Sequence, residues 1–262
     1  MPTSTASQWS LPPNATLNTN LTFAVRRKKD FTTNKKDAEN LKQRRKNIDA
    51  AKYKHIIWDW NGTLVNDAWL CVEIVNGMLK RRNKPPITYE QYRADFDHPV
   101  KDYYRRIGID FSVESFEVIA DEFITEHDKR RFDCKLQNDA VSVLKSCIGV
   151  GLTQSILSAY PQSRLEETID FYELRHYFTK VVGLNNHYAC SKIERGGQLM
   201  KELGFLPGEV LYVGDTVHDF EVAKAIGADC ILVCNGHNHP DKLRSCGIRV
   251  LNSMTEVLCL LS

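Results

Sequence analysis

From Lys54 onward, short apolar runs alternate with longer amphipathic stretches. Each short run is followed almost at once by Gly, Ser, Asn or Asp, which is typical of strands buried on both faces of a parallel sheet. A regular alternation of strand and helix predicts an α/β fold with a Rossmann-like, doubly wound parallel sheet. The expected strands span 55–58, 155–157, 180–184, 210–213 and 230–233, and the expected helices span 140–147, 163–171, 193–203 and 219–226.

The stretch from 67 to 133 interrupts this alternation. It contains no convincing strand, and Pro85-Pro86 and Asp97-His98-Pro99 divide it into several helical patterns. We therefore expect an inserted, all-helical domain at 67–133, carried by a core that comprises 53–66 and 134–262. The expected helices of the insert span 68–81, 89–96, 100–107 and 113–131.

The first 52 residues differ in composition from the rest of the chain. No charged residue precedes Arg26, and a basic run then extends to Lys54. This segment has too little apolar surface to offset the entropy that a chain loses when it becomes ordered. We therefore predict that 1–52 is a flexible basic extension. Its charge fits either a solvated surface or a segment that contacts a partner.

Charge and hydropathy exclude several classes of protein. The formal net charge is only +2, which provides no general attraction for nucleic acid. No apolar segment approaches the roughly 18 residues that a membrane span requires. The eight cysteines are scattered without a CxxC pair, as in a reducing compartment. We expect a cytoplasmic protein. The first arginine lies farther from the start than in a typical mitochondrial presequence, and organellar targeting is kept as an alternative.

Polar residues stand where the predicted strands end. Asp59 follows the first strand, Ser158 the second and Asp215 the fourth, and Lys192 begins a helix after the third. Because the carboxyl ends of parallel strands share one edge of the sheet, these residues are expected to converge. Carboxylates bind Mg²⁺, and a lysine and a hydroxyl can hold phosphate oxygens, so the set suits phosphoryl transfer.

These residues resemble the motifs of the haloacid dehalogenase superfamily. The run DWNGTL at 59–64 is similar to its first motif, Asp-x-Asp-Gly-Thr, except at Asn61. Ser158 and Lys192 match the second and third motifs, and GDTVHD at 214–219 matches the fourth. The resemblance covers about 54–262 and is closest to the phosphoglycolate phosphatase subgroup, whose members carry a helical cap.

The resemblance implies a Mg²⁺-dependent phosphatase that forms an aspartyl phosphate. Its substrate would be a small phosphorylated metabolite, phosphoglycolate-like or a sugar phosphate, chosen by the cap. Asp59 would be the nucleophile and Lys192 would act on the phosphoryl group. The implied metal contacts are Asp59, Asn61 through its main-chain carbonyl, Asp215 and Asp219, and the implied substrate contacts are Thr63, Ser158, Ala159, Lys192 and Lys101.

Asn61 departs from the family pattern. Most of these phosphatases have an aspartate there, which protonates the leaving group and later activates water. An amide has no proton to exchange near neutral pH, and general acid–base catalysis typically contributes about 10²- to 10⁴-fold. The site could remain active if the leaving group is good, as in an acyl or aryl phosphate, or if a cap residue or His218 supplies the proton.

Two other interpretations of Asn61 remain open. The first motif is also similar to that of phosphonoacetaldehyde hydrolase, in which a cap lysine forms a Schiff base, and Lys101 lies near the corresponding place. Alternatively, the domain no longer turns over and serves as a binding or scaffold module with the basic extension as its arm. Hydrolysis requires Asp59, whereas a scaffold tolerates Asp59→Asn.

A histidine-rich run follows the fifth expected strand. His237 and His239, with Cys234, contain metal-binding side chains, but further ligands at suitable spacing are missing from the sequence. We therefore predict a loop here and assign it no role in the site.

Overall fold

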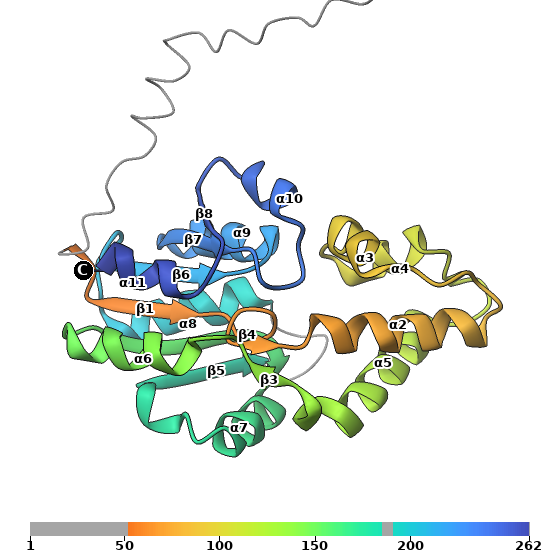
Figure 1. The fold of residues 1–262 in the computed structure, drawn as a ribbon, viewed down its shortest axis with the longest axis horizontal. Coiled ribbons are helices and arrows are strands. Elements are labelled where there is room, and N and C mark those ends of the chain that lie inside the picture. The colour runs from red at the N-terminus through yellow and green to blue at the C-terminus, as the bar shows by residue number, and fades with distance from the viewer. Residues whose placement is uncertain (1–51, 185–190, 262) are drawn as a thin grey trace, which may run out of the picture. The chain divides into compact units, whose positions relative to one another are not determined.

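A computed structural model describes residues 52–184 and 191–261, so the predicted extension at 1–52 lies outside the described residues except for its last one. The core is a six-stranded, all-parallel sheet in the order β5-β4-β1-β6-β7-β8 (Figure 1). The predicted α/β fold is confirmed. The strands are β1 (His55–Trp58), β4 (Thr153–Pro161), β5 (Lys180–Leu184), β6 (Val210–Gly214), β7 (Asp229–Val233) and β8 (Arg249–Leu251).

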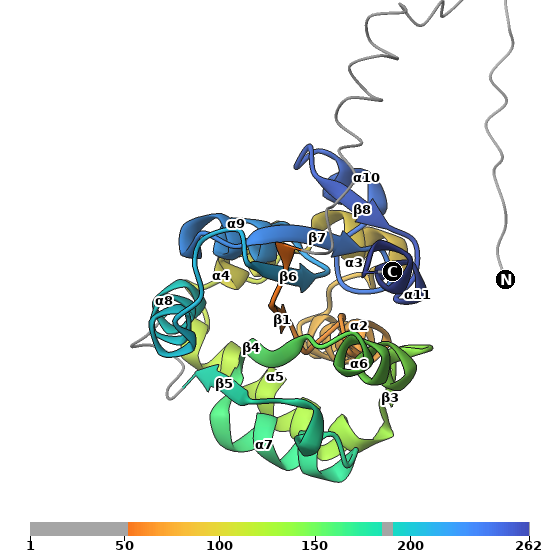
Figure 2. The ribbon, with the colours of Figure 1, turned by 90° about the vertical axis from the view of Figure 1, so that its left-hand side faces the viewer.

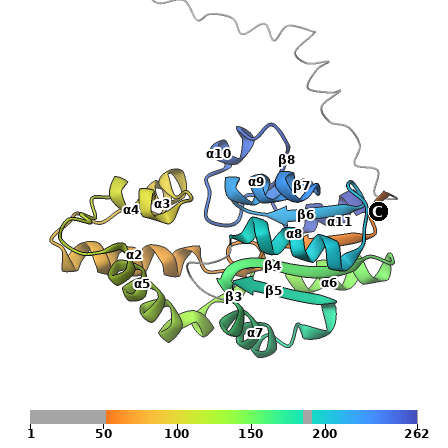
Figure 3. The same cartoon turned by 180° about the vertical axis from the view of Figure 1, so that it is seen from behind.

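Helices cover both faces of the sheet, as Figure 2 shows end-on. The view from behind places α8 and α9 in front of the strands (Figure 3), and α6 and α11 lie on the opposite face. The helices of the core are α6 (Ala140–Gly149), α7 (Gln162–Phe171), α8 (Lys192–Leu203), α9 (Val217–Ile226), α10 (Pro240–Arg244) and α11 (Thr255–Leu261).

The central strand β1 explains why the apolar runs are continuous rather than alternating. Ile57 packs with Leu199 of α8 and Val222 of α9 in one buried cluster. Its neighbours Ile56 and Trp58 belong to the other cluster, which includes residues of α6 and α11. Because successive side chains point to opposite faces and both faces are covered, every position of the strand must be apolar or internally bonded.

All five predicted strands are present, but three short strands were missed. They are β2 (Val65–Asn66), β3 (Lys135–Leu136) and β8, each with only two or three residues. A strand this short carries too few positions for a periodic signal. β2 and β3 pair antiparallel with each other, outside the main sheet.

Four α-helices lie between β2 and β3: α2 (Ala68–Arg81), α3 (Tyr89–Asp95), α4 (Val100–Arg106) and α5 (Phe116–Arg130). They agree with the predicted helices except at the start of α5, which begins three residues later than expected. Ser115 determines this start, because its hydroxyl accepts a hydrogen bond from the Val118 amide. The side chain of Arg82, just after α2, pairs with Glu114 and Glu122 and ties α2 to α5.

Within 52–184 and 191–261, none of the helices combines the length and apolar character needed to cross a bilayer. The cysteines in this part of the chain are free thiols, as predicted. The cytoplasmic location stays a prediction.

Candidate active site

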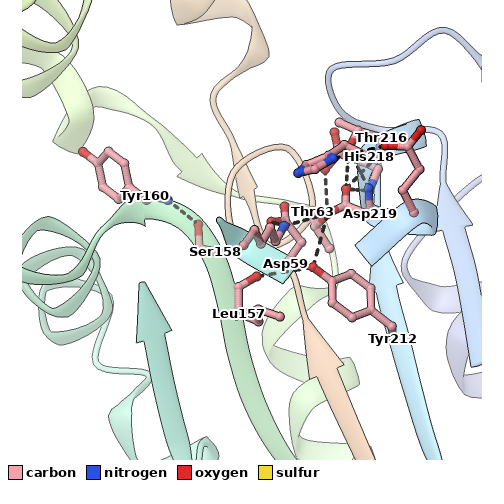
Figure 4. Close-up of polar contacts among 12 residues, drawn as sticks. Asp59, Thr63, Leu157, Ser158, Tyr160, Tyr212, Thr216, His218 and Asp219 are labelled. Carbon is pink, nitrogen blue, oxygen red and sulfur yellow. Dashed lines mark hydrogen bonds and ion pairs between the residues drawn. The ribbon is translucent and has the colours of Figure 1, made fainter. Parts of the chain in front are cut away.

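The polar strand ends meet at the carboxyl edge of the sheet (Figure 4). Carboxylate oxygens of Asp59, Asp215 and Asp219 all lie within 4.8 Å of one another. The ammonium of Lys192, at the start of α8, donates to Asp59 Oδ1 at 2.5 Å and to Asp219 Oδ1 at 2.6 Å. Because β1 and β6 are neighbours, residues 156 positions apart in sequence share one site, as the sequence predicted.

These charges are buried, and burial alters their protonation. Asp59 is only 6% exposed and Lys192 only 5%. Burial raises the pKa of Asp59 well above its usual value; Lys192 opposes the rise, and the carboxylates of Asp219 and Asp215 add to it. Burial likewise raises the pKa of Asp215 to about 6, against the opposing effect of His237. Three carboxylates in one dry site therefore repel one another.

Asp219 is held more firmly than the other two carboxylates. Burial would raise its pKa, but Lys192 and hydrogen bonds lower it to about 2. Its Oδ1 accepts from Lys192 and from Tyr212, and its Oδ2 accepts from Thr216 in the capping box of α9. Because both oxygens are already engaged, Asp219 is suited to orienting Lys192.

The donors fit a hard divalent cation. Mg²⁺ prefers oxygen ligands such as carboxylates. A bound dication would also offset the repulsion among the three carboxylates. Two glycines make room for this arrangement around Asp215. A Cβ on Gly62, which has φ +78°, would lie 2.3 Å from Asp215 Oδ2, and one on Gly236 would lie 2.0 Å from it.

A cavity of about 310 Å³ opens above this edge. Its floor includes Asp59, Asn61 and Lys192, and Ser158 and Ala159 also border it. Much of the remaining wall comes from the helices between β2 and β3 and is mainly apolar and aromatic, although His127, Asp128 and His237 also border the cavity. These helices contribute Val75 of α2, Tyr92 of α3, Val100, Tyr103 and Tyr104 of α4, and Phe116, Phe123 and Ile124 of α5.

A family comparison agrees with this geometry. Residues 56–233 match the model of the haloacid dehalogenase-like hydrolases, a range that contains Asp59, Lys192 and Asp215. The chain belongs to the haloacid dehalogenase-like hydrolase family. The resemblance inferred from the motifs is thereby confirmed, and the chain is a hydrolase of this family.

Individual relatives are distant. Phosphoglycolate phosphatase 1 of Pseudomonas aeruginosa is 24% identical over 193 residues, which cover 70% of each chain. A phosphoglycolate phosphatase of Synechococcus elongatus is 25% identical, over 72% of this chain and 87% of its own. Among solved structures, a haloacid dehalogenase-like hydrolase of Streptococcus pneumoniae superposes with a TM-score of 0.70 at 16% identity, covering 81% of this chain and all of its own (100%).

Two predicted substrate contacts of this hydrolase lie elsewhere. Thr63 is fully buried and does not line the cavity; its hydroxyl donates to Asp215 Oδ1 at 2.7 Å, because the turn at Gly62 directs it beneath that carboxylate. Lys101 does not line the cavity either. Its ammonium lies 5.5 Å from the ring centre of Phe111 and 5.6 Å from that of Phe116.

Helix geometry explains the position of Lys101. Val100, Tyr103 and Tyr104 border the cavity, and their spacing defines one face of α4. Lys101 is one position from Val100 and about 100° around the helix, so it lies off that face. The phosphonoacetaldehyde hydrolase interpretation thereby loses the lysine that it required.

Asn61 borders the cavity and is held by a residue that sequence reasoning missed. Its amide donates to Asp67 Oδ2 at 2.8 Å, and the Gly62 amide donates to Asp67 Oδ1 at 2.8 Å. Asp67 is buried, and its carboxylate also lies near two histidines, His237 and His127, at 3.3 and 3.7 Å. Burial opposes ionisation of Asp67, but His237 and His127 more than compensate, so its pKa is lowered.

His237 is the second missed residue. Burial would lower its pKa, but Asp67 raises it to about 9, so the imidazole is protonated at neutral pH. Its Nδ1 lies 2.9 Å from the hydroxyl of Tyr92, and its main-chain amide donates to Asp215. The predicted loop is present, and it follows the carboxyl end of β7. The rule that located the other polar strand ends could have found this histidine.

His218, which the sequence suggested as a proton donor, also borders the cavity. Its ring stacks on that of His98 with centroids 4.5 Å apart. Burial, with His218 next to it, lowers the pKa of His98 to about 3, so that imidazole is neutral. The pair therefore adds aromatic surface to the site, and the His98 ring adds no charge.

Proposed function

We propose that this hydrolase is a Mg²⁺-dependent phosphatase that cleaves a small phosphomonoester through an aspartyl phosphate on Asp59. The observation that carries the proposal is the buried Asp59–Lys192–Asp219 arrangement on the floor of a cavity, with Asp215 beside it. Relatives that are named phosphoglycolate phosphatases support a phosphate ester as the class of substrate.

The proposed reaction has two steps. A carboxylate oxygen of Asp59 attacks phosphorus while the ester oxygen leaves with its bonding electrons, and water then hydrolyses the aspartyl phosphate. Lys192 would neutralise charge on the phosphoryl oxygens, since it already lies against Asp59. The Ser158 hydroxyl and the chain at Ala159, which border the same cavity, would hold other phosphoryl oxygens.

Asp59, Asp215 and the main-chain carbonyl of Asn61 would hold Mg²⁺, and Asp219 would support the site through Lys192. When bound, the cation would offset the negative charge of the carboxylates and of the transferred phosphoryl group. We further propose that 67–133, with helices α2 to α5, is a cap domain on a core of 53–66 and 134–262. Side chains of these helices line much of the cavity.

The scaffold interpretation explains the floor poorly. Removing a lysine and two carboxylates from water costs several kcal/mol for each ion, and pairing recovers this only in part. A binding module has no need for such an arrangement. The burial of Lys192 between Asp59 and Asp219 is instead expected where charge must be positioned for chemistry.

Release of phosphate from 4-nitrophenyl phosphate tests the proposal. We expect hydrolysis with Mg²⁺, none after chelation, and a loss of roughly 10⁴-fold or more in Asp59→Asn. Asp170→Asn is the matched control, because Asp170 is exposed on α7 and its side chain pairs with the surface residue Arg175. Activity that survives Asp59→Asn would rule out the nucleophile.

A further inference from the structure

We infer that the substrate is an aryl phosphate, a monoester in which phosphate is bonded to an aromatic hydroxyl, rather than phosphoglycolate or a sugar phosphate. This inference rests on the proposed phosphatase function and specifies its substrate class. Three features of the cavity point to it: the nature of its wall, the residue at position 61 and a buried tyrosine hydroxyl.

The wall opposite the nucleophile suits an aromatic ring. Val75, Tyr104, Phe116, Phe123 and Ile124 border the cavity from three different helices. An apolar cavity of about 150 Å³ can hold benzene. At about 310 Å³, this cavity has space for one ring together with a phosphate group and a substituent.

The same wall does not suit a second anion. Among the described residues that border the cavity, Lys192 is the only lysine, no arginine is present, and Lys192 is already bound to Asp59 and Asp219. The protonated His237 also borders the cavity, but it is already paired with Asp67. The carboxylate of phosphoglycolate would lose its hydration against apolar side chains without gaining a cation that is free of another carboxylate. Each hydroxyl of a sugar phosphate would likewise lose its hydration against these apolar side chains.

The residue at position 61 points to the same class. Asn61 cannot protonate the departing oxygen, so the leaving group must carry its own negative charge. A phenol has a pKa near 10, about six units below that of water, and therefore leaves far more readily than an alkoxide. In the first step, the bond from phosphorus to the aryl oxygen breaks with its electron pair on that oxygen. The bond between Asp59 and phosphorus forms, and water later returns the carboxylate and releases phosphate.

The buried hydroxyl of Tyr103 suggests a polar substituent on the ring. Tyr103 is 1% exposed and borders the cavity, yet its hydroxyl has no hydrogen-bond partner among the described residues. Buried polar groups are rarely left unpaired, and a ligand group is one way to satisfy them. A hydroxyl or carbonyl on the aromatic ring could form this bond.

A matched panel of esters tests the inference in the full-length protein with Mg²⁺. Phenyl phosphate and benzyl phosphate share the ring but differ in leaving group, and phosphoglycolate replaces the ring by a carboxylate. We expect kcat/KM for phenyl phosphate to exceed that for phosphoglycolate by about 100-fold, and that for benzyl phosphate to be intermediate. A preference for phosphoglycolate or a sugar phosphate would overturn the inference and leave the phosphatase proposal intact. If even 4-nitrophenyl phosphate gives no Asp59-dependent hydrolysis, both fail.

Variants separate the contribution of the leaving group from that of the apolar wall. Asn61→Asp introduces a carboxyl beside Asp67, whose charge favours its protonated form, and should raise the ratio of benzyl phosphate to 4-nitrophenyl phosphate turnover about tenfold. Phe123→Ala should lower the ratio of phenyl phosphate to phosphoglycolate kcat/KM about tenfold. Phe171→Ala, at an exposed phenylalanine of α7, should leave this ratio unchanged.

The ratio does not depend on how much of each variant is folded, so a partly unfolded Phe123→Ala remains informative. An unchanged ratio in Phe123→Ala would show that the wall does not contact the ring. Equal gains for benzyl and 4-nitrophenyl phosphate in Asn61→Asp would show that the leaving group does not limit turnover.

Discussion

The floor and the wall of the cavity are built by opposite means. On the floor, Lys192 and Asp219 are buried ions. The Asp219 carboxylate accepts hydrogen bonds from Lys192, from Tyr212 and from the main-chain amide at the start of α9. The wall, drawn from α2 to α5, consists mainly of apolar and aromatic side chains. Directed bonds hold reacting groups in one geometry, whereas apolar contacts select by shape and size. In the proposed phosphatase, the floor would carry out the chemistry and the wall would select the substrate.

Lys192→Met should have the largest effect, because it leaves two buried carboxylates without their cation. We expect the free energy of unfolding to fall by about 3–5 kcal/mol, measured by urea denaturation without added Mg²⁺. Lys180→Met is the control. Lys180 pairs with Glu202 at the surface, where such pairs contribute about 0–1 kcal/mol. Similar losses in both variants would contradict the distinction between floor and surface.

Gly62→Ala should come next. Gly62 and Gly208 both have positive φ, so alanine at either position costs about 1–2 kcal/mol of backbone strain. Only at Gly62 would the new Cβ meet a neighbour, Asp215 Oδ2, at 2.3 Å. We expect a total loss of about 3 kcal/mol for Gly62→Ala and about 1 kcal/mol for Gly208→Ala. Equal thermal denaturation midpoints would show that Asp215 can move away easily.

The ion pair between His237 and Asp67 should make stability depend on pH. Because folding raises the pKa of His237 from 6.5 to about 9, its stabilisation is complete below pH 6.5 and is lost as pH rises through 9. We expect the free energy of unfolding to fall by about 2–3 kcal/mol over this range. His237→Gln should flatten the profile, and an unchanged slope in that variant would assign the titration to another group.

The smallest contrast is between two tyrosines of the wall. Tyr92→Phe removes the hydroxyl next to His237 Nδ1 and should destabilise the protein by about 1 kcal/mol. Tyr103→Phe removes a hydroxyl without a partner among the described residues, so the free energy of unfolding should stay the same or rise slightly. Urea denaturation checks both variants. A clear loss of unfolding free energy in Tyr103→Phe would contradict this contrast, because it would mean that the Tyr103 hydroxyl has a partner after all.

Most of the floor could be predicted because its residues follow a rule of position. Asp59 and Asp215 each come directly after a strand, Ser158 lies in the carboxyl-terminal half of β4, and parallel strands bring such residues to one edge. Asp67 and His237 were missed for different reasons. Asp67 follows a two-residue strand that has no periodic signal, and His237 was assigned to a loop without applying the same rule to the end of β7.

Lys101 and Thr63 show where motif reasoning reaches its limit. Both lie close in sequence to residues that border the cavity, but side-chain direction separates them from it. On α4, a shift of one position turns the side chain by about 100°. After β1, the left-handed glycine turn at Gly62 sends the threonine inward to Asp215.

The sequence alone determined the α/β class, the helices and the convergence of charged strand ends, because hydrophobic period and strand polarity are local properties. Only the tertiary structure decided what surrounds Asn61 and which side chains form the wall. Those contacts join residues as distant as Asp67 and His237, and their approach depends on how the helices of 67–133 pack against the loop after β7. Such packing arises from many weak contacts between segments, and no short run of sequence contains it.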